Sequence, residues 1–290
     1  MFTDQNSWQH EYINTNGVKL HYVTQGRGRL MLFLHGFPEF WYSWRHQIPE
    51  FAQHFQVVAV DLRGYNDSDK PKDKSAYVMA EFIQDVEGVI KGLGHDSCIL
   101  VGHDWGGAIA WNFAYAHPEM VDRLIVLNLP HPAKFAQGLS TPQQLLRSWY
   151  IFLFQLPWLP EFLLKFDHYQ AIAKAISGTA VNQLAFTPDD LEAYRQASAK
   201  SGALTAMLNY YRNVFSSSLF QKNWDILQVT TLMIWGENDT ALGKELTYNT
   251  DTYVKNLEIK YIPACGHWVQ QEQPQLVNQY IRDYLSDVIY

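Results

Sequence analysis

The chain has 290 residues, of which 47% are hydrophobic and 18% charged, and its formal net charge is −7. This length and composition allow a large buried core and exclude an intrinsically disordered chain. No basic stripe occurs, so we expect no nucleic-acid partner. Residues 1–11 are polar and the two cysteines, Cys98 and Cys265, form no disulfide framework, so we expect a cytoplasmic protein without a secretory signal.

Apolar runs alternate with helical patterns in the first half of the chain and again near its end. Residues 11–13 and 18–23 flank an Asn-Thr-Asn-Gly turn and predict a hairpin. Continuous apolar runs then predict strands of a parallel sheet that is buried on both faces. These runs cover residues 30–34, 56–60, 98–101, 124–127 and 232–235, and a sixth strand-like segment covers 257–262.

Amphipathic or alanine-rich patterns predict helices between these runs. They cover residues 79–93, 106–116 and 275–285. Strands that alternate with helices imply right-handed crossovers, so we predict an α/β fold with a mostly parallel, doubly wound sheet.

The alternation stops in the middle of the chain. Residues 131–222 are helical in pattern, aromatic and punctuated by prolines, and we interpret them as a helical cap inserted into a core of residues 1–130 and 223–290. The most apolar stretch, residues 149–166, is interrupted by polar residues and prolines. It is therefore predicted to be buried or to line a pocket, with no stable membrane insertion.

The central motif is G-H-D-W-G-G at residues 102–107, between an apolar run and a helix. This is the context of a nucleophile elbow, with Asp104 where a serine would be expected. The small flanking glycines permit a sharp turn, and the amide of Trp105 would point toward the reacting centre. The alternative is an ordinary strand-to-helix turn with an N-cap aspartate.

The segment H-G-F-P-E at residues 35–39 directly follows the first buried strand. A loop at this position can supply the second backbone amide of an oxyanion hole. We predict Phe37 as the donor, with His35 and Pro38 as neighbouring binding residues. The alternative is a Gly-Pro loop without a function.

Two late segments provide an acid and a base. Asp239 follows the run 232–235 and would orient a histidine, with Glu237 as the competing carboxylate. His267, after the segment 257–262, would be the base, although a single loop histidine can also be structural. The order Asp104, Asp239, His267 is the α/β-hydrolase order of nucleophile, acid and base.

These motifs, with G-Y-x-x-S-D at residues 64–69, resemble the epoxide hydrolase branch of the α/β-hydrolase superfamily over nearly the whole chain. The resemblance implies an α/β-hydrolase fold and the opening of epoxides to vicinal diols through an ester on Asp104. We expect a small apolar epoxide and water as substrates, and a monomer or homodimer. No cofactor is expected, and the histidines lack a metal-ligand spacing such as H-E-x-x-H.

The cap carries the residues that would separate epoxide chemistry from related reactions. Epoxide hydrolases of this family use two cap tyrosines to hold the epoxide oxygen, and the resemblance maps these to Tyr211 and Tyr150. Both could instead be packed aromatics. The cap aromatics suggest a bulky apolar substrate, or they simply pack the cap against the core; they are Trp149, Phe152, Phe154, Trp158, Phe162 and Phe166.

Two other functions remain open from the sequence. Haloalkane and haloacetate dehalogenases share the core motifs, and the indole of Trp105 could bind a halide. Against this, Phe37 stands where haloalkane dehalogenases have asparagine, and Trp105 stands where fluoroacetate dehalogenases have arginine. A non-catalytic receptor or interaction protein of this fold would usually lose a member of the catalytic triad, and all three are present here.

Overall fold

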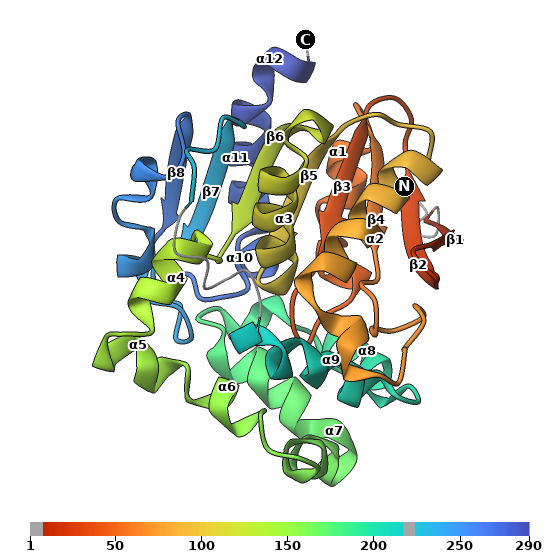
Figure 1. Ribbon diagram of the computed structural model, residues 1–290, viewed down its shortest axis with the longest axis vertical. Helices are drawn as coiled ribbons and strands as arrows, with labels where there is room; N and C mark the ends of the chain where they lie inside the picture. Colours follow the sequence, from red (N-terminus) through yellow and green to blue (C-terminus); the bar gives the residue numbers. More distant parts are fainter. Residues whose placement is uncertain (1–7, 217–223, 290) are drawn as a thin grey trace.

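The computed structural model describes residues 8–216 and 224–289, and an eight-stranded sheet lies at its centre (Figure 1). The strand order is β1-β2-β4-β3-β5-β6-β7-β8. Within this sheet the pairs β1–β2 and β2–β4 are antiparallel, and the other pairs are parallel. The strands are β1 Gln9–Thr15, β2 Val18–Gln25, β3 Leu30–Leu34, β4 Gln56–Val60, β5 Cys98–His103, β6 Val121–Leu127, β7 Thr231–Gly236 and β8 Leu257–Ile262.

Helices cover both faces of the sheet, which confirms the predicted α/β class. Successive residues of β3 face opposite layers, because side chains alternate along a strand. Leu32 packs with the helices α2 and α3, whereas Phe33 packs with α1 and α11. The core helices are α1 Ile48–Phe51, α2 Met79–Gly92, α3 Trp105–Ala116, α10 Val269–Glu272, α11 Pro274–Tyr284 and α12 Ser286–Ile289.

In the described part of the chain, six further α-helices lie between β6 and β7 and cover one end of the sheet (Figure 1). They are α4 Pro132–Gly138, α5 Pro142–Arg147, α6 Trp149–Leu153, α7 Leu159–Thr179, α8 Pro188–Ala199 and α9 Ala203–Arg212. We call α4–α9 the cap. The predicted cap boundary stays a prediction, and its last residues, 217–222, lie outside the described residues, as does residue 223.

Direct hydrogen bonds join the cap to the core. The hydroxyl of Tyr210 in α9 donates to the carbonyl oxygen of Arg63 at 2.6 Å, and the side chain of Asn213 donates to the carbonyl oxygen of Lys74 at 2.8 Å. These buried or half-buried bonds fix α9 above the sheet, so the cap residues next to Tyr210 have a defined position over the core.

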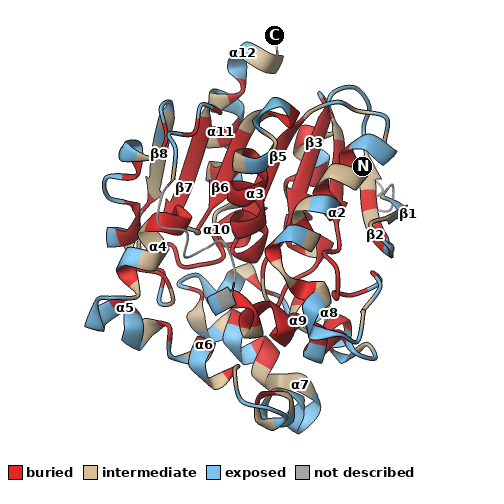
Figure 2. Cartoon of the chain, in the orientation of Figure 1, coloured by how far each residue is buried: buried red, intermediate tan, exposed pale blue. Residues whose placement is uncertain are grey.

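The prediction that residues 149–166 are buried or line a pocket holds for part of the segment, because Trp149, Leu153 and Phe154 line a large cavity under the cap, but most of its aromatics are exposed. Trp158, Phe162 and Phe166 are 72%, 61% and 70% exposed, and of the six cap aromatics only Phe154 is buried. Figure 2 shows the outer surfaces of α5–α7 largely exposed or intermediate. The reason is that α7 leaves the core: its backbone is non-helical at residues 166–169, and its first half projects away from the sheet.

The described parts of the chain, residues 8–216 and 224–289, contain no helix that is both long and apolar enough to cross a membrane.

Close approach of α3 to β3 requires a glycine at position 106. A Cβ atom on Gly106 would lie 2.1 Å from the carbonyl oxygen of Leu34. We predict that Gly106→Ala lowers the free energy of unfolding by about 1–3 kcal/mol or more, because backbone must move to admit the methyl group. Gly178→Ala is the matched control, since Gly178 lies in a helix and a Cβ atom there would meet no other part of the chain within 4 Å. Chemical denaturation measures both, and equal stabilities would contradict the prediction.

Candidate active site

Asp104 occupies a strained turn between β5 and α3. Its backbone has φ 50° and ψ −122°, a region that residues other than glycine rarely adopt and that costs about 1–3 kcal/mol. The turn is tight, because a Cβ atom on Gly102 would lie 2.4 Å from the carbonyl oxygen of Gly106. The Asp104 side chain makes no capping hydrogen bond to α3, unlike an ordinary N-cap aspartate. Its carboxylate is therefore available for other contacts.

The loop after β3 holds one oxygen of this carboxylate. The backbone N–H of Phe37 donates to Asp104 Oδ1 at 2.8 Å. Only glycine fits before it, because a Cβ atom on Gly36 would lie 2.4 Å from Cβ of Asp104. Trp105 opens α3, so its N–H is one of the amides without a partner inside the helix. The two predicted oxyanion donors thus come from the loop after β3 and from the first residue of α3.

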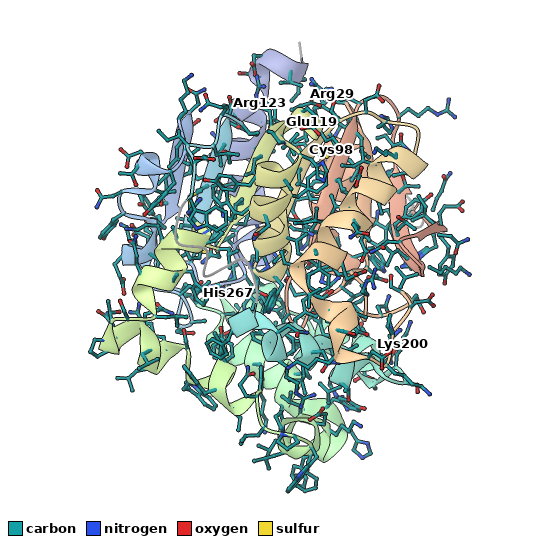
Figure 3. The ribbon with its side chains drawn as sticks, viewed as in Figure 1. Arg29, Cys98, Glu119, Arg123, Lys200 and His267 are labelled. Atoms are coloured by element: carbon teal, nitrogen blue, oxygen red, sulfur yellow. The ribbon has the colours of Figure 1, made fainter. Side chains whose placement is uncertain are left out.

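His267 lies between the two predicted acidic partners. Its Nδ1 is 2.7 Å from Asp239 Oδ2, and its Nε2 is 3.6 Å from Asp104 Oδ2. Figure 3 places His267 where the strand ends of the core meet the cap, far from Cys98 at the opposite end of β5. All three side chains are buried. The structure therefore brings the predicted nucleophile, acid and base together.

Asp239 is fixed by donors on both of its oxygens. The side chain of Asn128 donates to Oδ2 at 2.7 Å, and the backbone N–H groups of Ala241 and Leu242 donate to Oδ1 at 2.8 and 3.0 Å. The competing carboxylate, Glu237, is paired with Lys244. Asn128 was missed by sequence reasoning, because a single asparagine after a strand carries no distinguishing pattern.

The electrostatics of the three groups are coupled. Burial alone would raise the pKa of Asp104 and of Asp239, but His267 outweighs it and holds both below the usual value of 3.8. Burial would lower the pKa of His267, yet the charge of Asp239 and the contacts with Asp104 raise it well above 6.5. The three groups therefore stabilise one another's charged forms.

Glu39 links the oxyanion loop to the nucleophile turn. This fully buried carboxylate accepts from the N–H of Gly36 at 3.0 Å and from the side chain of Gln271 at 2.8 Å, and it lies 2.8 Å from Nδ1 of His103. The other ring nitrogen of His103 lies 2.9 Å from the carbonyl oxygen of His267. Glu39 is part of the H-G-F-P-E motif, and that motif was its only signal in the sequence.

The remaining predicted residues of this loop have different surroundings. Pro38 lines the large cavity described below, together with Phe37. His35 is fully buried, and its ring contacts backbone groups. Nε2 accepts a hydrogen bond from the N–H of Leu62 at 3.0 Å, and Nδ1 lies 2.9 Å from the carbonyl oxygen of Gly36. His35 thus holds the loop against the chain that follows β4.

Two apolar cavities meet at Asp104. The larger has a volume of about 770 Å³ and lies under the cap, and the smaller, of about 40 Å³, lies toward α4. Asp104, Tyr150 and Tyr211 line both. Of the cap aromatics, Trp149 and Phe154 line the larger cavity. An elongated apolar molecule could therefore pass Asp104 with a group on each side.

Tyr150 in α6 and Tyr211 in α9 pack edge to face, with ring centroids 5.8 Å apart. The ring of Tyr211 also packs edge to face on Trp105 and on Phe37, with a centroid distance of 5.2 Å in each case. Burial, followed by the negative charge of Asp104, raises the pKa of both phenols. Both tyrosines therefore keep their protons at neutral pH beside the candidate nucleophile.

A group of potential metal ligands occurs elsewhere. Among the described residues, His21, Asp61 and Asp67 place ligand atoms within 4.8 Å of one another. The oxygens of Asp61 already accept hydrogen bonds from the N–H of Trp41 at 2.9 Å and from Asn66 at 2.7 Å, and Oδ2 lies 2.6 Å from His21 Nδ1. These bonds give the group a structural role at the edge of the sheet.

Comparison with known proteins gives a consistent result. The model of the α/β hydrolase fold family matches residues 29–274. Epoxide hydrolase 3 of Xenopus tropicalis is 44% identical over 289 residues, which cover 96% of this chain and 78% of that protein. Epoxide hydrolase 4 of Homo sapiens is 42% identical, over 95% of this chain and 78% of that protein. The crystal structure of a Bacillus megaterium epoxide hydrolase in complex with an inhibitor is 39% identical with a TM-score of 0.90, covering 95% of this chain and 100% of that one.

We predict that Asp104→Asn lowers the pKa of His267. The substitution removes one of the two negative charges that raise this pKa, while Asp239 remains. Titration of the histidine ring signals by NMR measures the change. Glu237→Gln is the control, because Glu237 pairs with Lys244 and should leave the pKa of His267 unchanged. An unchanged pKa in Asp104→Asn would show that the two groups are not coupled.

Proposed function

The chain belongs to the α/β hydrolase fold family, within its epoxide hydrolase branch, and we propose that it opens epoxides to vicinal diols through an ester on Asp104. One observation carries this proposal: the Asp104 carboxylate faces the amide of Phe37, the His267–Asp239 pair and a cavity lined by two protonated tyrosines. An ionised carboxylate is already a nucleophile, and its lowered pKa keeps it ionised at neutral pH.

Alkylation is the first step. Because Oδ1 of Asp104 accepts the Phe37 amide, Oδ2 is the oxygen free to attack an epoxide carbon. The carbon–oxygen bond of the ring breaks, and its electron pair moves to the epoxide oxygen. That oxygen takes a proton from Tyr150 or Tyr211, which leaves a hydroxyalkyl ester and a tyrosinate.

Hydrolysis is the second step, and the first step prepares it. Ester formation removes the charge of Asp104, so His267 loses one of the two anions that raise its pKa. It passes its proton to the tyrosinate and becomes a neutral base that takes a proton from water, and the hydroxide attacks Cγ of Asp104. The developing oxyanion on Oδ1 meets the amides of Phe37 and Trp105. The ester bond breaks, the leaving alkoxide takes a proton from His267, and the released carboxyl group of Asp104 gives its proton back to His267.

The cavities support an apolar substrate with one bulky group. The larger cavity is lined mainly by aliphatic and aromatic side chains, such as Leu153, Phe154 and Leu164. The smaller cavity admits only a compact group next to Asp104. An epoxide with a large apolar substituent on one carbon would place that substituent in the larger cavity.

The covalent route makes an isotopic prediction. In ¹⁸O-labelled water, the first single turnover of the wild-type enzyme places unlabelled protein oxygen in the diol, because water attacks the ester carbonyl. Mass spectrometry of the product measures this. His267→Gln should accumulate the alkyl-enzyme, and Asp239→Asn should accumulate it less completely, because it only disorients the histidine. Solvent label in the first diol would point to direct attack by water.

The tyrosines make a second prediction. Tyr211→Phe slows alkylation by an epoxide, and the double variant with Tyr150→Phe nearly stops it, since one general acid contributes about 10²–10⁴-fold. Stopped-flow single-turnover kinetics measures alkylation directly. An alkyl halide that the enzyme accepts is the control, because its leaving group needs no proton. Unchanged epoxide alkylation in the double variant would mean that both rings only pack the cap.

A further inference from the structure

Four backbone amides converge on one buried carboxylate near His267. Glu272, in α10, is 3% exposed. Its Oε1 accepts from the N–H groups of Gly266 and Trp268 at 3.1 and 3.3 Å. Its Oε2 accepts from the N–H groups of Val181 and Asn182 at 2.8 and 3.0 Å. Each oxygen therefore binds a different segment of the chain.

One of these segments carries the catalytic base and the other belongs to the cap region. Gly266 and Trp268 are the two neighbours of His267, whereas Val181 and Asn182 follow the end of α7. A second bond joins the same segments: Nε1 of Trp268 donates to the hydroxyl oxygen of Thr179 at 2.9 Å. We call these two contacts, through Glu272 and through Thr179, the α7 joint.

The α7 joint is tightly packed. A Cβ atom on Gly266 would lie 2.8 Å from Oε1 of Glu272 and 2.9 Å from the carbonyl oxygen of Thr179. The last part of α7 also forms a wall of the large cavity through Ile172, Ala175 and Thr179. A helix that lines the large cavity thus ends at the loop that holds His267.

Glu272 has no cationic partner among the ion pairs of the described residues, so it is not there to neutralise a charge. Hydrogen bonds between an amide and a carboxylate are roughly twice as strong as those between neutral groups. Gly266 and Trp268, the two neighbours of His267, are therefore held by ion–dipole hydrogen bonds as well as by packing.

We propose that Glu272 is a positioning residue that fastens the His267 loop to the end of α7 and keeps the imidazole aligned for ester hydrolysis. This rests on the proposed role of His267 as the base of the second step. Alkylation is spared, because the Asp104 carboxylate is held by the amide of Phe37 on a separate loop. Glu272 thus affects ester hydrolysis only, and it acts through His267 rather than through direct contact with the substrate.

Glu272→Gln tests the proposal. The side-chain amide has nearly the same shape, but its NH₂ group faces two backbone N–H donors, so one side of the joint is lost. We expect ester hydrolysis to fall by about ten- to a hundredfold, because small misplacement of a catalytic group has effects of this size. Alkylation should keep its rate. In steady state, kcat and KM then fall together while kcat/KM stays constant, and alkyl-enzyme accumulates.

Two further variants define the result. Thr179→Val keeps the branched shape but removes the acceptor for Trp268, so it should slow the same step by a smaller factor. Glu192→Gln is the matched control, because this cap carboxylate contacts Arg195 and Gln196 within α8 and should leave both steps unchanged.

Thermal unfolding of each variant checks the fold. If Glu272→Gln does not fold, Thr179→Val decides: slower hydrolysis supports the joint, and an unchanged rate overturns it.

Adduct formation in the wild type tests the proposed function separately from the role of Glu272. Absence of any adduct on Asp104 with a reactive epoxide would overturn the proposed function. An adduct that forms and hydrolyses normally in a folded Glu272→Gln variant would overturn only the role of Glu272. Equal slowing of both steps would do the same, since it would indicate a general effect on the fold.

Discussion

The placement of Asp104 depends on backbone segments that approach one another without side chains between them. Gly36, Gly102 and Gly106 each lie where a Cβ atom would come within 2.4 Å of another segment or of Asp104 itself. This closeness holds the positive φ of Asp104 and presses its carboxylate against the Phe37 amide. The rest of the site is arranged around the Asp104 carboxylate, because His267 and the two tyrosines can act only if they lie close to its oxygens.

The charges of the site form a single system rather than three separate groups. His267 lies between two buried carboxyl groups and lowers the pKa of each, and the two carboxylates in turn raise the pKa of His267. Such a system changes as a unit when one charge disappears. Conversion of Asp104 to an ester is a change of this kind, and it explains how one histidine can first stabilise an anionic nucleophile and then act as a base.

The core of this fold was predictable from the sequence because its signals are local. The run 30–34 is a strand with the same bounds, and the motif at residues 102–107 forms the expected turn. The cap was less predictable. Aromatic residues such as Trp158 and Phe162 look like core residues in the sequence, but the break in α7 turns them toward solvent. Asn128 and Glu272 were not predictable either, because Asn128 bonds Asp239, 111 residues away in the chain, and Glu272 bonds the cap at Val181, 91 residues away.

The apolar walls of the large cavity also set the thermodynamics of substrate recognition. Side chains such as Leu153 and Leu164 offer water no hydrogen-bond partners, so solvent there is poorly held and easily displaced. Transfer of a hydrocarbon group into such a space removes apolar surface from water, and the heat capacity of the system falls as a result. Affinity should then change with temperature more for the bulky part of an epoxide than for its reactive ring. Discrimination among substrates would follow the size of their hydrocarbon portion, whereas the chemistry at the ring would remain common to all of them.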